Sequence, residues 1–175
     1  MNHEVTRLRP LLESDLLTVL SWRNHPSIKM FMLTQHEITL DEHQIWFESA
    51  NKDKTKRLMV FEENNIALGF VSFNSISKNG TANWGFYIAP ESPKGLGKKL
   101  GYHALSFAFV NLELHKICGQ ALSFNQRSIN LHKSLGFQQE GIMRDQHFDG
   151  ENYHDLICFG ILKQEWKNII LEEKL

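Results

Sequence analysis

The order of apolar and polar positions along the chain changes its period several times, and each change predicts a new secondary-structure element. A short strand-like stretch ends at Pro10, and apolar residues then recur at helical spacing in two segments. We expect Ser14 to cap the first of these helices and Pro26 to end it. Thr39 and Glu42 have the spacing of a capping box at the start of the second.

From residue 57 the apolar period shortens to two, which predicts three successive strands. The pair Asn64-Asn65 between the first two is typical of a tight hairpin turn. Later in the chain we expect a helix, a strand, a shorter helix stopped by Gly136, and a final hairpin around Asp149-Gly150. This order predicts a mixed α/β protein built on a central sheet. No repeat or flexible linker divides the sequence, so we expect a single domain over residues 1–175.

Composition narrows the class of protein. The chain is 42% hydrophobic and 22% charged, as is usual for a soluble globular domain. A net charge of -1 gives no basic excess for nucleic acid, and no polybasic or long apolar run indicates a membrane partner. Cys118 and Cys158 lie in apolar runs without Cys-x-x-Cys spacing, so we expect two buried free thiols and no metal site. The first residues contain no apolar signal core, which favours a cytoplasmic location.

Residues 92–101, SPKGLGKKLG, are the clearest candidate for chemistry, because a glycine-rich turn here leads from a strand into a helix. The first N–H groups of a helix have no partner within it, and its dipole is positive at that end, so such a turn binds anions. Gly95 and Gly97 lack a Cβ and would let a phosphate approach the backbone. The glycine spacing fits neither a nucleotide-triphosphate loop nor a dinucleotide fingerprint. An ordinary turn with a solvated lysine face is the alternative that this loop leaves open by itself.

Three segments, the loop included, resemble motifs of one enzyme superfamily. Residues 87–105, YIAPESPKGLGKKLGYHAL, resemble the signature segment of the GCN5-related N-acetyltransferases, and residues 125–141, NQRSINLHKSLGFQQEG, resemble a later motif of that superfamily. Residues 148–166 are similar to its branch of ribosomal-protein N-terminal acetyltransferases. The resemblance covers about residues 5–166. It implies a twisted sheet that is mixed but mostly antiparallel, flanked by helices, with strands that splay apart at a cofactor site.

The resemblance also implies the cofactor, acetyl-CoA. Its pyrophosphate would lie on the glycine loop, its pantetheine arm between the splayed strands, and its thioester carbonyl near the backbone N–H of Ile88. Ser92 departs from the pattern of the family, which has Gln or Arg at that place. The residues implied to bind the cofactor are Tyr87, Ile88, Ala89, Lys94, Gly95, Leu96, Gly97, Lys98, Lys99, Asn125 and Ser128.

Direct attack of an amine on a thioester needs proton transfer but no metal. Many relatives have a Tyr where this chain has His132, and a histidine can serve as a general acid near neutral pH. The alternatives are a structural histidine and a proton that passes through water. Ser72 and Gln120 interrupt apolar strands, where they either face solvent or hold a water or substrate. The catalytic candidates are therefore His132, Ser72 and Gln120.

The resemblance implies that the first two helices and the last hairpin form most of the acceptor site. Arg23 could grip phosphate and Trp46 could stack on a base, although both are also plausible as packing residues. The run from LSWRNHP to HQIWF resembles the N-acetyltransferases of pseudaminic acid biosynthesis, which precedes flagellin glycosylation. That resemblance implies a nucleotide sugar as acceptor, UDP-4-amino-4,6-dideoxy-N-acetyl-β-L-altrosamine. The candidate substrate-binding residues are Arg23, Asn24, His25, Met32, His36, His43, Trp46 and Phe47.

Two other functions stay open at this point. One is N-terminal acetylation of a protein, as in the ribosomal branch, and the other is a non-catalytic sensor that binds acyl-CoA. The sequence also leaves the oligomeric state open, a homodimer included.

Overall fold

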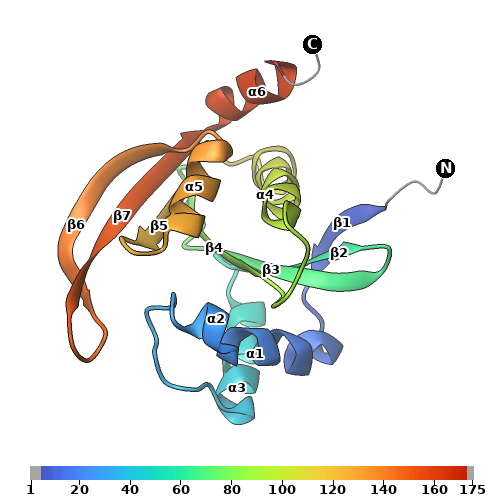
Figure 1. The fold of residues 1–175 in the computed structure, drawn as a ribbon. Helices are drawn as coiled ribbons and strands as arrows, with labels where there is room; N and C mark the ends of the chain where they lie inside the picture. Colours follow the sequence, from blue (N-terminus) through green and yellow to red (C-terminus); the bar gives the residue numbers. More distant parts are fainter. Residues whose placement is uncertain (1–4, 173–175) are drawn as a thin grey trace.

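The computed structural model describes residues 5–172, which form one seven-stranded sheet with helices on both faces (Figure 1). The strand order is β1-β2-β3-β4-β5-β7-β6, and every neighbouring pair is antiparallel except β4 and β5. The predicted α/β architecture with a mixed, mostly antiparallel sheet is confirmed. The first four and last three residues of the predicted domain lie outside the described residues.

The strands are β1 (Thr6–Pro10), β2 (Arg57–Glu63), β3 (Ile66–Asn74), β4 (Thr81–Ile88), β5 (Lys116–Leu122), β6 (Gln138–Phe148) and β7 (Tyr153–Leu162). The helices are η1 (Glu13–Asp15), α1 (Leu16–Asn24), α2 (Pro26–Lys29), α3 (Leu40–Lys52), α4 (Leu96–Ser106), the π-helical turn η2 (Phe107–Asn111), α5 (Gln126–Ser134) and α6 (Lys163–Glu172).

Local sequence patterns predicted several of these boundaries correctly. Thr39 Oγ1 accepts a hydrogen bond from the Glu42 N–H (3.2 Å), and the Glu42 carboxylate accepts one from the Thr39 N–H (2.7 Å), so the capping box is present. Asn64 and Asn65 both have positive φ (52° and 65°), as a tight hairpin turn requires. Gly136 takes a left-handed conformation (φ 87°) just beyond α5.

Two predicted boundaries were wrong. Ser14 does not cap a helix, because it lies inside η1, and α1 begins only after Asp15. The Asp15 carboxylate instead accepts from the Leu12 N–H (2.9 Å) and pairs with Arg9 (2.7 Å). The second strand of the final hairpin, which we expected to run over residues 151–166, ends at Leu162 instead. The residues beyond it form α6, whose Trp166 is fully buried in the core.

The sheet separates two apolar cores. One lies beneath α4, α5 and α6, and the other lies beneath α1, α2 and α3 (Figure 1). Because side chains alternate along a strand, β4 contributes to both. Trp84 and Phe86 pack in the first core, whereas Tyr87 packs against the second.

The centre of the sheet opens where β4 and β5 part. Their parallel pairing covers only three positions and ends at Asn83 opposite Cys118. Beyond that point β4 stays paired with β3 as far as Ile88, and β5 stays paired with β7 as far as Leu122. We call the resulting gap, between residues 84–88 of β4 and 119–122 of β5, the fork. It is the splay that the resemblance implied.

Thr39→Ala tests the energetic role of the capping box. Loss of the side-chain acceptor leaves the Glu42 N–H to solvent, and we expect the free energy of unfolding to fall by about 1 kcal/mol. Chemical denaturation measures this change. Thr18→Ala, at an exposed position inside α1, is the matched control and should not destabilise the protein. Equal effects of the two substitutions would contradict the capping role.

Candidate functional site

The fork leads into two adjoining cavities. The larger, of about 370 Å³, lies within the fork and is called the fork pocket. The smaller, of about 120 Å³, runs toward the first turns of α4 and α5 and is called the side pocket. The residues that line both are Phe31, Met32, Phe86, Tyr87, Asn125 and Ser128. The shared walls make the two cavities parts of one site.

Backbone donors of β4 face the fork. The Ala89 N–H donates to the Leu68 carbonyl (2.9 Å), so it points toward β3. Because successive N–H groups of a strand point to opposite edges, those of Phe86 and Ile88 point the other way, where β5 has moved away. These two groups are fixed donors that a bound ligand can use.

The first turn of α4 lies beside the side pocket. Gly95 precedes the helix with a φ of 93°, a conformation that favours glycine, and a Cβ built there would meet nothing within 4 Å. The Gly95 carbonyl accepts from the Lys98 and Lys99 N–H groups (3.0 and 3.3 Å), which starts the helix. The N–H groups that precede Lys98 therefore point out of the helix end, and Gly97 itself lines the side pocket.

Only some of the residues predicted to bind the cofactor line the side pocket. Five of them line the side pocket, namely Tyr87, Ile88, Gly97, Asn125 and Ser128. Leu96 is buried in the core, so only its backbone can face a ligand. Lys99 forms an ion pair with Glu63 (2.9 Å), Lys98 lies over the Tyr102 ring, and Lys94 is exposed.

Asn125 and Arg127 mark the other wall of the side pocket. Asn125 caps α5, because its side-chain oxygen accepts from the Ser128 N–H (3.1 Å). Arg127 also lines the side pocket, which the sequence analysis did not predict. Its position in the first turn of the helix capped by Asn125 was the signal that could have identified it.

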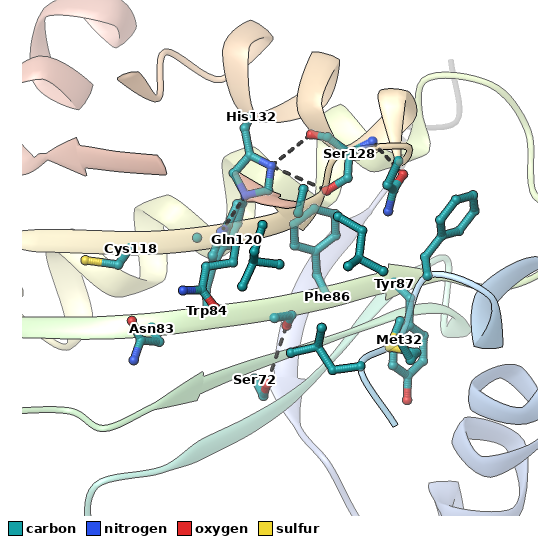
Figure 2. A pocket seen from close by; sticks show the side chains of 18 of the residues that line it. Met32, Ser72, Asn83, Trp84, Phe86, Tyr87, Cys118, Gln120, Ser128 and His132 are labelled. Atoms are coloured by element: carbon teal, nitrogen blue, oxygen red, sulfur yellow. Dashed lines mark hydrogen bonds between the residues drawn. The ribbon is translucent and has the colours of Figure 1, made fainter. Parts of the chain in front are cut away.

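His132 is buried, with 1% of its surface exposed, and both of its ring nitrogens are engaged (Figure 2). Nδ1 lies 2.8 Å from the Ser128 carbonyl oxygen, which can only accept, so Nδ1 carries the proton. Nε2 then accepts from the Trp84 indole N–H (3.1 Å). Burial lowers the pKa of His132 to about 4. A neutral ring whose N–H is already used does not fit the general acid that the sequence predicted.

Ser72 and Gln120 both line the fork pocket. Ser72 Oγ accepts from the Asn74 side chain (3.0 Å), and the Gln120 amide lies 3.8 Å from the sulfur atoms of Met143 and Cys158. The Ser72 hydroxyl donates only to the distant Gly85 carbonyl (3.5 Å), and the sulfur contacts of Gln120 are weak, so either side chain can also bind a water or a substrate. Their catalytic role stays a prediction.

Of the eight residues predicted to bind the acceptor, only Met32 lines the fork pocket or the side pocket. Two of the others bond to the backbone of the segment 30–39. The Asn24 amide bonds to both the N–H and the carbonyl of Ile38 (2.9 and 2.8 Å), and Arg23 donates to the Thr34 carbonyl (2.9 Å). That segment in turn supplies Phe31, Met32 and Leu33 to the wall of the fork pocket.

The remaining predicted acceptor residues also have structural contacts. The ring of His25 bonds to Ser27 at the start of α2, and His36 pairs with Glu42. The His43 ring stacks on Trp46 (4.9 Å), and burial lowers the pKa of His43. Trp46 and Phe47 pack against the core beneath α1–α3. Direct contact with an acceptor through these side chains is therefore not supported by the structure.

The lining of the fork pocket is uncharged. Among the described residues that form it there is no Asp, Glu, Lys or Arg, and His132 is neutral. Its polar side chains include Ser72, Asn83, Cys118, Gln120, Asn125, Ser128 and His132. Asn83 and Cys118 were not predicted, although Asn83 alternates with the buried Ala82 and Trp84 and so had to face the other side of β4.

Both cysteines are free and half-buried rather than fully buried as expected. Within residues 5–172, no group of three or more His, Cys, Asp or Glu side chains could hold a metal ion. In the same part of the chain, no helix combines the length and the hydropathy required to cross a bilayer.

Comparisons with known proteins agree with this geometry. The family described as "Acetyltransferase (GNAT) domain" matches residues 6–138. An uncharacterised prophage-derived N-acetyltransferase, YokL of Bacillus subtilis, is 37% identical over 69% of this chain and 68% of its own. Acetyltransferase PseH of Campylobacter jejuni is 27% identical over 73% of this chain and 79% of its own. The crystal structure of Vibrio cholerae spermidine N-acetyltransferase with CoA and spermine matches with a TM-score of 0.87 at 26% identity, covering 93% and 98% of the two chains.

The buried His132 predicts a loss of stability in acid. The unfolded chain binds a proton at this ring below about pH 6.5, but the folded protein does so only below about pH 4, so folding becomes less favourable as the pH falls through that window. Each pKa unit of difference corresponds to about 1.4 kcal/mol, so the free energy of unfolding should fall by about 3 kcal/mol near pH 4. Urea denaturation from pH 7 to pH 4 measures it.

His132→Leu provides the comparison for this pH dependence, because it removes the titrating group. The stability of the variant should fall less steeply than that of the wild type over the same window. Parallel curves for the two proteins would show that His132 keeps an ordinary pKa in the folded state.

Proposed function

The chain belongs to the acetyltransferase (GNAT) family and is an acetyl-CoA-dependent N-acetyltransferase; within that activity, we propose that its acceptor is the 4-amino group of a UDP-linked amino-deoxy sugar. The sugar suggested by the sequence is UDP-4-amino-4,6-dideoxy-N-acetyl-β-L-altrosamine. The observation that carries the proposal is the uncharged lining of the fork pocket.

The site residues fit acetyl-CoA, which supplies an acetyl group activated as a thioester when it is bound. The helix end at Gly95–Gly97 offers outward N–H groups and open space to a pyrophosphate. Arg127 adds a cation to the side pocket. We assign the N–H groups of Phe86 and Ile88 to the pantetheine arm and to the thioester carbonyl oxygen, because both face the fork.

The uncharged lining favours a sugar amine over a polyamine. A polyamine is a polycation at neutral pH, and transfer of an ammonium group out of water costs several kcal/mol unless an anion compensates it. Hydroxyl and amide groups such as those of Ser72, Asn83 and Gln120 suit a sugar, whose own groups are hydroxyls and amides. Phe70 and Tyr87 add flat apolar faces on which a ring can pack.

The same lining suits an amine that deprotonates easily. A sugar amine has a pKa below that of a lysine side chain, about 10.4, so the neutral nucleophile forms near neutral pH without a carboxylate base. We propose that Ser72 and Gln120 hold a water in the fork pocket that relays the ammonium proton to solvent, from which the departing CoA thiolate is protonated.

Polyamine acetylation is the second candidate. The overall similarity to the Vibrio cholerae spermidine enzyme, with a TM-score of 0.87, favours it. Fold similarity alone does not determine the acceptor, because the acceptor is selected by side chains that line the site.

An acceptor panel tests the proposal. Release of the CoA thiol is followed with acetyl-CoA and, in turn, a UDP-4-amino-4,6-dideoxy sugar, spermidine and ribosomal-type N-terminal peptides. We expect the nucleotide sugar to have the highest kcat/KM, by about a hundredfold or more over spermidine, since an unpaired buried ammonium is penalised. Greater activity with spermidine or with a peptide would overturn the assignment. Binding of CoA without turnover of any amine would favour a sensor.

Gly97→Ala tests the pyrophosphate position. The added Cβ would lie 3.4 Å from Leu131, an ordinary contact, so the fold should tolerate it. The methyl group would reduce the space at the helix end, and we expect the Kd for CoA to rise about tenfold by calorimetry, about 1.4 kcal/mol of binding free energy. Thermal unfolding without CoA serves as the control. An unchanged Kd would place the pyrophosphate elsewhere.

A further inference from the structure

We propose that His132 is a positioning residue rather than a proton donor: with Trp84 it forms a wedge at the closed end of the fork, and this wedge sets the separation between β4 and the cofactor-binding turn of α5. The proposal concerns binding of the cofactor and does not depend on the identity of the acceptor.

The wedge lies where the two strands part. Asn83 and Cys118 form the last pair of β4 and β5, so Trp84 and Gly119 are the first residues of the fork. A Cβ built on Gly119 would lie 2.6 Å from the Trp84 Nε1 atom and closer still to His132 Nε2. The hydrogen-bonded rings therefore rest directly on the backbone of β5, and only glycine leaves room for them.

Aromatic neighbours hold both rings in this position. The His132 ring stacks on Phe159 of β7 (4.7 Å, 10°) and meets Phe137 edge-on (5.0 Å). The Trp84 ring stacks on Phe137 (5.1 Å, 17°). Since Phe159 belongs to the β5–β7 half of the sheet, the wedge is anchored on that half while Trp84 belongs to the other.

The two hydrogen bonds of His132 join the two sides of the site (Figure 2). Nε2 accepts from Trp84 on β4, and Nδ1 donates to the Ser128 carbonyl in the first turn of α5. Ser128 lines both pockets, and Phe86, two residues beyond Trp84, carries an N–H that faces the fork. A change at His132 would thus move the cofactor donors of β4 relative to α5, although the ring itself touches no reacting atom in this proposal.

A double-mutant cycle on the Kd for CoA tests the wedge. We expect His132→Leu and Trp84→Phe each to raise the Kd about tenfold or more, because each leaves one buried partner of the hydrogen bond unpaired. In the double variant, the increase in the Kd for CoA should be about tenfold smaller than the product of the two single increases, because the partners interact with each other. We expect kcat at saturating acetyl-CoA to stay within about threefold of wild type in His132→Leu, as for a residue that acts through binding.

A general acid would give the opposite pattern. His132→Leu would then lower kcat strongly and remove a protonation step from its pH profile, with the Kd for CoA unchanged and no coupling to Trp84→Phe. That outcome would overturn the proposal.

Gly119→Ala tests the same contact from the β5 side. Its methyl group would displace the rings, and we expect the Kd for CoA to rise by tenfold or more. Gly141→Ala is the matched control in a strand, because a Cβ there would meet nothing within 4 Å and the Kd should not change. Equal Kd values for the two variants would contradict the wedge.

A measurement on the unmodified protein keeps the proposal testable if these variants do not fold. In NMR spectra at pH 7 we expect the His132 ring to be neutral with its proton on Nδ1, and the Trp84 indole N–H to exchange slowly with solvent. An indole proton that exchanges as fast as an exposed one, or a ring protonated on Nε2, would show that the hydrogen bond is absent.

Discussion

The site depends on the absence of strand pairing in the middle of the sheet. Backbone N–H groups in the interior of a protein are almost always paired, so a gap between two central strands must be maintained by other contacts. Here β4 is held by β3 along its outer edge and β5 by β7, which lets the two strands part after Asn83 and Cys118 without loss of order. The gap exposes a row of oriented donors at the place where a thioester can be bound.

The walls of the fork pocket in this chain are uncharged. The fork belongs to the architecture of the sheet, because it follows from the strand pairing alone. Under the function proposed above, the acceptor is selected by the side chains of these walls, which in this chain are neutral hydroxyl, amide and aromatic groups. Enzymes of one fold can thus transfer the same acetyl group to amines of very different charge.

Much of the architecture could be predicted from local sequence signals, because a capping box, an Asn-Asn turn or a helix-ending glycine acts within a few residues. Ser14 failed as a cap because Asp15, one residue later, gained Arg9 and the Leu12 N–H as partners. Most of the predicted acceptor residues lie outside the two pockets for a related reason. Residue type shows that Arg23 and Asn24 can make hydrogen bonds, but only the folded chain shows that these bonds go to the backbone of residues 34 and 38. The contact between His132 and Trp84, 48 residues apart, is equally absent from any local pattern.

Asn24 and Arg23 anchor the segment 30–39 through its backbone, whereas Phe31, Met32 and Leu33 present side chains to the pocket. The anchors and the lining are therefore different residues, and the anchors do not depend on which side chains the segment carries. Mutations at positions 31–33 can then alter the shape of the cavity while the segment keeps its path. Such a division lets acceptor preference diverge among descendants of one enzyme without loss of the fold.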